Sequence, residues 1–347
     1  MSSSLYSLCL FFIVLFSFSA YVGKSNRAFM NFKQQEHFAT ISLMLFCVIG
    51  MASLPVPWNT GADREFYAYN FLNLLLLEEK DILFTQYCKI FGNILSVKQM
   101  FYLTAFIYVG NFYLAIRKMV PNNTYMLLLL FVTSFLFYAY GTNTMRAGLA
   151  ASFIILAIAY SDNLKIMCVL LLIGVNIHFS MIIPTIAIVV TNFYVNVRLF
   201  FYLWLLAVGL SLLLGSYFEY LFMSMGLMDG YSGYFGIKQA DTHYKVGFRW
   251  DFLLYGSLPI IAGLYYIYYR HVKSLFYQRI FSIYILANMF WVLVIRSAFS
   301  DRIAYLSWFI YPLILTYPLF KERLSSKNSM MIAFILLGME MLVYFIL

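Results

Sequence analysis

Apolar runs long enough to cross a bilayer occupy most of this chain. A helix needs about 20 mainly apolar residues to cross roughly 30 Å of hydrocarbon. Candidate spans lie near 5–22, 38–55, 99–116, 123–140, 147–160, 199–215, 252–269, 280–296, 303–320 and 329–346. Only 11% of the residues are charged, whereas soluble domains have roughly a quarter. The sequence therefore predicts an all-α polytopic membrane protein.

The region 164–194 is the ambiguous part of this pattern. Its apolar stretch is broken by polar residues and a proline, at Asn176, His178, Ser180 and Pro184. Two interpretations stay open: two short helices that meet at the outer surface, or a re-entrant pair buried in protein. With the ten candidate spans above, the region 164–194 gives about 10–12 transmembrane helices. We expect them to form a single integral membrane domain, residues 1–347.

Basic side chains gather in one set of loops. With about twelve segments, 13 of the 23 basic residues and three of the 14 acidic ones lie in the loops 23–37, 117–121, 161–165, 195–198, 270–279 and 321–328. The positive-inside rule makes this face cytoplasmic. Both termini and two long loops, at about 56–98 and 216–251, are then expected outside. A count of ten segments would place the second long loop inside.

The charge and cysteine patterns exclude several classes of protein. The formal net charge of +9 is spread over short loops, so it reports membrane orientation and predicts no nucleic-acid partner. The four cysteines form no disulfide framework and no metal-binding spacing. The sequence contains no phosphate-binding glycine loop, serine nucleophile elbow or His-Glu-x-x-His motif. We expect neither a metal nor another cofactor.

Ionisable residues interrupt the ends of four apolar runs, all on the face expected outside: Arg146, His178, Arg249 and Arg302. Such groups are costly at membrane depth and usually mark a substrate site. Arg146 lies among small residues that let helices approach closely, so it either borders a buried pocket or reaches lipid headgroups. His178 either acts as an acid or base, binds a phosphate, or bridges two helices.

Further candidates lie in three short motifs near these positions. Asp63, in Gly61-Ala62-Asp63-Arg64-Glu65-Phe66-Tyr67, either accepts a proton from a sugar hydroxyl or is a solvated loop charge. Arg249 and Asp251 either pair with each other or bind substrate. The motif Arg296-Ser297-Ala298-Phe299-Ser300-Asp301-Arg302 carries two arginines around a short turn. Converging guanidinium groups can bind a pyrophosphate bidentately.

The order of these motifs resembles the EpsG/Wzy-type polymerases of bacterial exopolysaccharide, capsule and O-antigen. The resemblance covers about residues 55–320 and rests on Gly61-Ala62-Asp63 with Tyr67, Met145-Arg146 with Ala150, His178-Phe179-Ser180, Phe248-Arg249-Trp250-Asp251-Phe252, and Arg302 with Tyr305. One departure is Ala147, where the family commonly has glutamine. A contact that the side-chain amide of this glutamine makes in the family is therefore not expected at Ala147.

The resemblance implies a glycosyltransferase similar in fold to other membrane glycosyltransferases. Such enzymes act on repeat units linked to undecaprenyl pyrophosphate, at the outer face of the bacterial cytoplasmic membrane. The expected substrate-binding residues are Arg146, Arg249, Asp251, Arg302, Tyr67, Tyr305 and Arg296, and the expected base is Asp63 or His178. Expected partners are the lipid-linked glycans, membrane lipids, a chain-length regulator and a flippase. The expected reaction is independent of metal.

Two other functions remain as alternatives. A related enzyme could ligate the glycan to another lipid or protein, or could transfer an acyl group at the outer face. A flippase or exporter that catalyses no reaction is the second alternative. Because transport requires a polar path across the whole bilayer, and the polar residues gather near one face, the pattern favours an enzyme at the outer face.

Overall fold

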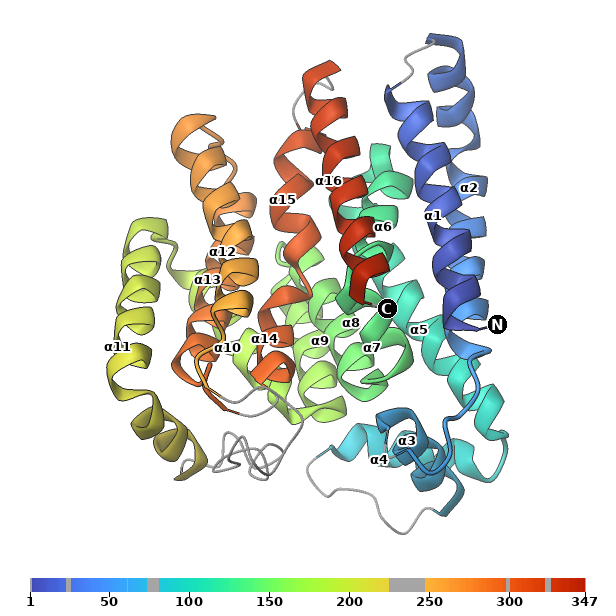
Figure 1. Ribbon diagram of the computed structural model, residues 1–347, viewed down its shortest axis with the longest axis horizontal. Coiled ribbons are helices and arrows are strands. Elements are labelled where there is room, and N and C mark those ends of the chain that lie inside the picture. Colours follow the sequence, from blue (N-terminus) through green and yellow to red (C-terminus); the bar gives the residue numbers. More distant parts are fainter. Residues whose placement is uncertain are drawn as a thin grey trace. The chain divides into compact units, whose positions relative to one another are not determined.

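The computed structural model describes residues 2–22, 26–60, 62–73, 81–224, 247–297, 300–321 and 326–346. Every regular element in these ranges is helical (Figure 1). The α-helices are α1 (Ser3–Val22), α2 (Asn26–Ala52), α3 (Asp63–Asn73), α4 (Ile82–Gly92), α5 (Val97–Met119), α6 (Thr124–Val132), α7 (Phe135–Thr142), α8 (Met145–Ala159), α9 (Leu164–Ile177), α10 (Ile182–Phe193), α11 (Val197–Ser224), α12 (Trp250–Leu264), α13 (Leu275–Leu293), α14 (Ser300–Trp308), α15 (Tyr311–Lys321) and α16 (Ser326–Ile346). Short 3₁₀ turns precede α6 and α10, at Pro121–Asn123 and Phe179–Met181, and a π-helix, Tyr265–Tyr269, extends α12.

The helices confirm the predicted class, an all-α polytopic membrane protein. Among the described residues, five helices are long and apolar enough to cross a membrane, or six if one bent pair counts as a span. This number is lower than the expected 10–12, because several expected spans form apolar helices of 10–17 residues. One example is α8, which has 15 residues.

Contacts within the chain divide it into two compact units. Unit 1 is Met1–Phe179 with Thr316–Leu347, and unit 2 is Ser180–Leu315. The expected single membrane domain over residues 1–347 stays a prediction.

Unit 1 is built from pairs of packed helices. Helix α1 packs against α16, α2 against α5 and α6, and α8 against both α5 and α9. Helix α1 begins and α16 ends on the side of the unit that carries α3 and α4 (Figure 1). The ion pair between Lys118 and Asp162, at 3.0 Å, joins two segments that were expected on the cytoplasmic face. These contacts agree with the expected grouping of the loops, while the side of the membrane stays a prediction.

One expected span, 123–140, is bent rather than straight. Helices α6 and α7 meet at 74° across Thr133 and Ser134. The Ser134 hydroxyl accepts a hydrogen bond from the N–H of Phe137, which caps the start of α7. A capping serine satisfies an N–H that would otherwise lack a partner, so it allows a new helix to begin in a new direction. Apolarity alone does not reveal such a bend.

The expected long loop 56–98 contains two helices, α3 and α4, of 11 residues each, which the sequence analysis did not predict. Arg64 anchors α3. Its guanidinium donates to the carbonyl oxygens of Ala52, Leu54 and Thr142, at 3.0 to 3.2 Å, and lies 3.9 Å from the centre of the Phe101 ring. These bonds attach α3 to the ends of α2 and α7.

The region 164–194 forms two short helices, α9 and α10, separated by a break at residues 178–181, and this agrees with both interpretations. The break lies at the division between the two units, so the choice between an outer-surface pair and a re-entrant pair stays open. The expected loop 216–251 was too long at its start, because α11 continues to Ser224. Residues 225–246 of that loop lie outside the described residues.

Gly148, in α8, lies directly against the backbone of Tyr140 in α7. A Cβ atom added there would overlap the carbonyl oxygen of Tyr140 and lie 2.8 Å from its Cβ atom. We therefore expect Gly148→Ala to lower the free energy of unfolding by about 1–3 kcal/mol, the usual cost of overpacking. A thermal melt of the purified protein in detergent measures this effect. Gly110→Ala in α5 is the matched control, because nothing lies within 4 Å of an added Cβ there and its stability should not fall.

Candidate functional site

A buried carboxylate, Asp81, is the centre of a charged cluster in unit 1. Its side chain is only 4% exposed. Its Oδ2 atom lies 2.9 Å from Nη1 of Arg146 and 3.4 Å from Nδ1 of His178. Its Oδ1 atom accepts a hydrogen bond from the backbone N–H of Phe179 at 2.8 Å. The three residues Asp81, Arg146 and His178 are called the Asp81 cluster below.

The ends of three helices bring the Asp81 cluster together. Asp81 immediately precedes α4, Arg146 lies in the first turn of α8, and His178 follows the last residue of α9. Helices α8 and α9 pack along each other, and α4 packs against α9. Gly174 allows the close approach of α8 and α9, because a Cβ there would lie 2.7 Å from Cδ1 of Ile154. The start of α8 and the end of α9 therefore meet at one end of the unit.

The electrostatics of the cluster favour an ionised carboxylate. Burial by itself raises the pKa of Asp81, but the hydrogen bond and charge of His178, the charge of Arg146 and the N–H of Phe179 together lower the pKa below its usual range. The carboxylate therefore stabilises the fold at neutral pH. This contribution is fully present above the unfolded pKa of about 3.9, and it is lost as the pH falls through the lower pKa of the folded state.

Two of the predicted site residues, Arg146 and His178, are thus brought together, but by a third residue that was not predicted. Asp81 ends the run Glu78-Glu79-Lys80-Asp81, and such a run in a long loop suggests solvated charges. A usable signal was its position directly before the apolar stretch Ile82-Leu83-Phe84, because aspartate is common where a helix begins.

The predicted residues Asp63 and Tyr67 lie in α3, also in unit 1. Asp63 is in the first turn of the helix and is partly buried. Tyr67 is 8% exposed, and its ring packs edge-on against Phe84 of α4 with the ring centres 5.9 Å apart. Tyr67 therefore supports the helix that follows Asp81. Gly61 lies outside the described residues.

In unit 2, Arg249 and Asp251 pair with each other, which was one of the two expected arrangements. Nε and Nη2 of Arg249 lie 2.9 and 2.7 Å from the two carboxylate oxygens. The guanidinium also lies 3.4 Å from the centre of the Phe252 ring. The bidentate pair fixes the orientation of the guanidinium at the start of α12.

The predicted residues Arg296, Arg302 and Tyr305 lie at the turn between α13 and α14, also in unit 2. Nη2 of Arg296 donates to the carbonyl oxygen of Leu212 at 2.9 Å, so this guanidinium attaches the turn to α11. Arg302 is partly buried in the first turn of α14. The hydroxyl of Tyr305 donates to Oδ2 of Asp301 at 3.1 Å. Arg146 belongs to unit 1, whereas Arg249 and Arg302 belong to unit 2, so the convergence of the three arginines stays a prediction.

The fold and the cluster define a helical membrane protein with an arginine and a histidine held by a buried carboxylate at the ends of its helices. The model of the EpsG family matches residues 37–347, and the chain belongs to that family. This is the family of Wzy-type polysaccharide polymerases, which confirms the resemblance found in the motifs. Membership supports a role as a polysaccharide polymerase of the glycosyltransferase type. No curated protein and no solved structure gave a significant match.

Proposed function

We propose that the protein polymerises oligosaccharide repeat units linked to undecaprenyl pyrophosphate, at the outer face of the bacterial cytoplasmic membrane. The product would be an O-antigen, capsule or exopolysaccharide. The observation that carries this proposal is the Asp81 cluster, which holds Arg146 and His178 side by side at 2.9 and 3.4 Å from one carboxylate oxygen. The charge distribution of the sequence predicts that this end of unit 1 faces outward, which supports the proposal.

The reaction is a transfer of the growing glycan to the incoming repeat unit. The bond between the anomeric carbon of the glycan and its diphosphate breaks, and a new bond forms to a hydroxyl oxygen of the acceptor sugar. The hydroxyl proton goes to a base, and undecaprenyl diphosphate leaves. The leaving group develops negative charge, so it needs positive hydrogen-bond donors placed in advance.

Arginines can supply these donors without a metal, because a guanidinium stays charged and binds phosphate oxygens in a fixed geometry. Arg146 takes this role in unit 1, and Arg249 and Arg302 complete the clamp. The remaining proposed binding residues, Tyr67, Asp251, Arg296 and Tyr305, contact the sugars or the phosphates. Arg146 is 16% exposed, so it is accessible to a ligand while being held by Asp81.

His178 is the better candidate for the base than Asp63. Its Nδ1 atom faces Asp81, which leaves Nε2 to accept the hydroxyl proton. A carboxylate on the first nitrogen orients the ring and stabilises the imidazolium that forms. The contact of 3.4 Å is long for a hydrogen bond, and such contacts often tighten when a substrate binds.

The purified protein in detergent should convert lipid-linked repeat units into a ladder of polymer, because the reaction needs no membrane to cross. The rate should be the same with a metal chelator present. Gel analysis of the glycans measures both results. A single transfer to a second lipid or protein would instead indicate a ligase, and no product from active preparations would support a flippase or exporter.

A further inference from the structure

A second group of polar side chains lies at the other end of unit 1 from the Asp81 cluster. Arg146 lies in the first turn of α8, a helix of 15 residues, which is about 22 Å long at 1.5 Å per residue. Just past the other end of α8, Asp162 forms an ion pair with Lys118 at 3.0 Å. The last turn of α5, with Arg117 and Lys118, therefore lies far from the Asp81 cluster, at the end expected in the cytoplasm.

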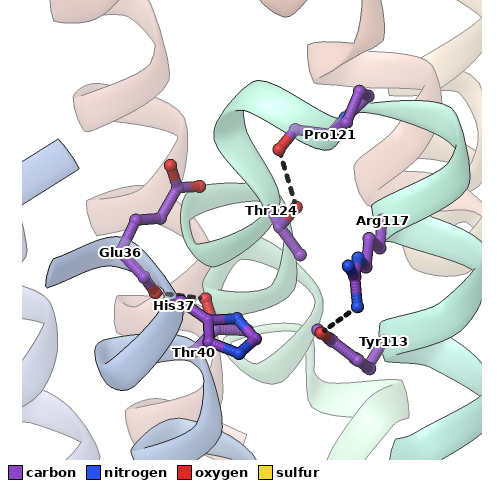
Figure 2. A pocket seen from close by; sticks show the side chains of 7 residues that line it. All are labelled: Glu36, His37, Thr40, Tyr113, Arg117, Pro121 and Thr124. Atoms are coloured by element: carbon purple, nitrogen blue, oxygen red, sulfur yellow. Dashed lines mark hydrogen bonds between the residues drawn. The ribbon is translucent and has the colours of Figure 1, made fainter. Parts of the chain in front are cut away.

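A cavity of about 240 Å³ opens at this end between α2, α5 and the start of α6 (Figure 2). It is lined by Glu36, His37, Thr40, Tyr113, Arg117, Pro121 and Thr124. The lining combines one cation, one anion, an imidazole and three hydroxyl groups. Nothing in the proposed polymerase reaction uses these side chains.

The cavity offers hydrogen-bond donors around Arg117. The Arg117 guanidinium is exposed, and it donates one N–H to the hydroxyl of Tyr113 at 3.1 Å. A guanidinium has five N–H donors, so others are free to bind a ligand. The Tyr113 hydroxyl accepts that bond, and its own proton is therefore available. These donors suit the oxygens of a phosphate group.

The cavity also offers acceptors on the opposite wall. The Thr40 hydroxyl donates to the carbonyl oxygen of Glu36 at 2.6 Å, and the Thr124 hydroxyl donates to that of Pro121 at 3.3 Å (Figure 2). Each hydroxyl has one proton, so these two oxygens can only accept from a ligand. A ligand that satisfies both walls carries phosphate oxygens together with hydroxyl donors.

The carboxylate of Glu36 does not prevent an anion from binding beside Arg117. Its Oε1 atom accepts from the N–H of Tyr125 at 3.2 Å. Tyr125 lies in the first turn of α6, where unpaired N–H groups and the helix dipole stabilise negative charge. The Glu36 carboxylate is thus bound at the start of α6. The positive charge of Arg117 is available to a ligand.

We propose that this cavity binds the headgroup of an anionic phospholipid with hydroxyl groups, such as phosphatidylglycerol. Arg117 and the Tyr113 hydroxyl take the phosphate, and the headgroup hydroxyls donate to Thr40 and Thr124. A lipid suits the site better than free phosphate, because α5 is long and apolar enough to span the membrane and the cavity lies at its last turn. Basic pockets between membrane helices on the cytoplasmic side commonly bind anionic headgroups. This inference is independent of the polymerase proposal.

The test is native mass spectrometry of the purified full chain titrated with phosphatidylglycerol, phosphatidylcholine or inorganic phosphate. Arg117→Ala should weaken phosphatidylglycerol binding about tenfold or more, because it removes charged hydrogen bonds. Lys118→Ala is the matched control and should bind normally, because Lys118 pairs with Asp162 instead. Both side chains lie near the surface, so both variants should fold.

A second variant tests the acceptor wall. Thr124→Val keeps the shape of the side chain but removes its oxygen, so it should reduce the preference for phosphatidylglycerol over phosphatidic acid, which lacks the headgroup hydroxyls. Equal losses in Arg117→Ala and Lys118→Ala would show a general surface-charge effect and overturn the proposal. Inorganic phosphate that binds in an Arg117-dependent way and displaces the lipid would assign the site to free phosphate instead.

Discussion

Arg146→Ala should stop the synthesis of long polymer. In the proposed reaction, Arg146 donates to the diphosphate as its negative charge develops. Removing one such donor costs about 3 kcal/mol of transition-state stabilisation, which is about a 10²-fold loss of rate. Polymer length on a gel and the initial rate in detergent both measure the effect. Lys118→Ala, at the far end of unit 1, should leave both unchanged.

The structure also requires a control for stability in this experiment. Arg146→Ala leaves the buried carboxylate of Asp81 without its ion partner at 2.9 Å, so the protein could be lost through misfolding. A second variant, Arg146→Ala combined with Asp81→Asn, also removes the buried negative charge and should recover membrane abundance. It should still make no long polymer. A double variant that polymerises at the wild-type rate would exclude Arg146 from the reaction.

Asp81→Ala should be the most destabilising change in the cluster. It removes the carboxylate that forms the ion pair with Arg146 and accepts from the N–H of Phe179. Removing one partner of a buried ion pair typically costs 3–5 kcal/mol, so we expect a loss of about that size. Thermal melts in detergent measure it. Asp162→Asn is the matched control, because that carboxylate is exposed and its ion pair with Lys118 lies at the surface, so its melt should hardly change.

The pH dependence of this effect has a definite sign. The pKa of Asp81 is lowered in the folded protein, so the ionised carboxylate stabilises the fold at neutral pH. The advantage of the wild type over Asp81→Asn should therefore be constant near neutral pH and shrink below about pH 4, where the carboxyl becomes protonated. A difference between the two melts that stays the same into acid would show that the charge of Asp81 contributes nothing.

Much of the fold could be predicted from the lengths of the apolar runs, since most of them became helices near their expected positions. The bend between α6 and α7 could not, because Thr133 and Ser134 lie in an apolar stretch without a glycine or proline. Helices α3 and α4 were also missed. At 11 residues each they are too short to cross a bilayer, and a search for spans does not find them.

The site was predictable only in part, for a similar reason. Arg146 and His178 interrupt apolar runs, so their positions are unusual and suggest function. Asp81 follows other charged residues in a polar segment, and its burial depends on contacts with α8 and α9, which lie far along the chain. The spacing of Arg249 and Asp251 was compatible with a mutual pair or with substrate binding, and only the coordinates show the pair.

The most direct test of the account is to locate the diphosphate itself on the protein. An undecaprenyl diphosphate analogue with a photoreactive group beside the diphosphate can be cross-linked to the purified full chain, and the labelled peptides can be identified by mass spectrometry. We predict labelling around Asp81, Arg146 and His178, and a loss of that labelling in the double variant Arg146→Ala with Asp81→Asn. Labelling confined to the opposite end of unit 1, around Arg117 and Lys118, would contradict the account.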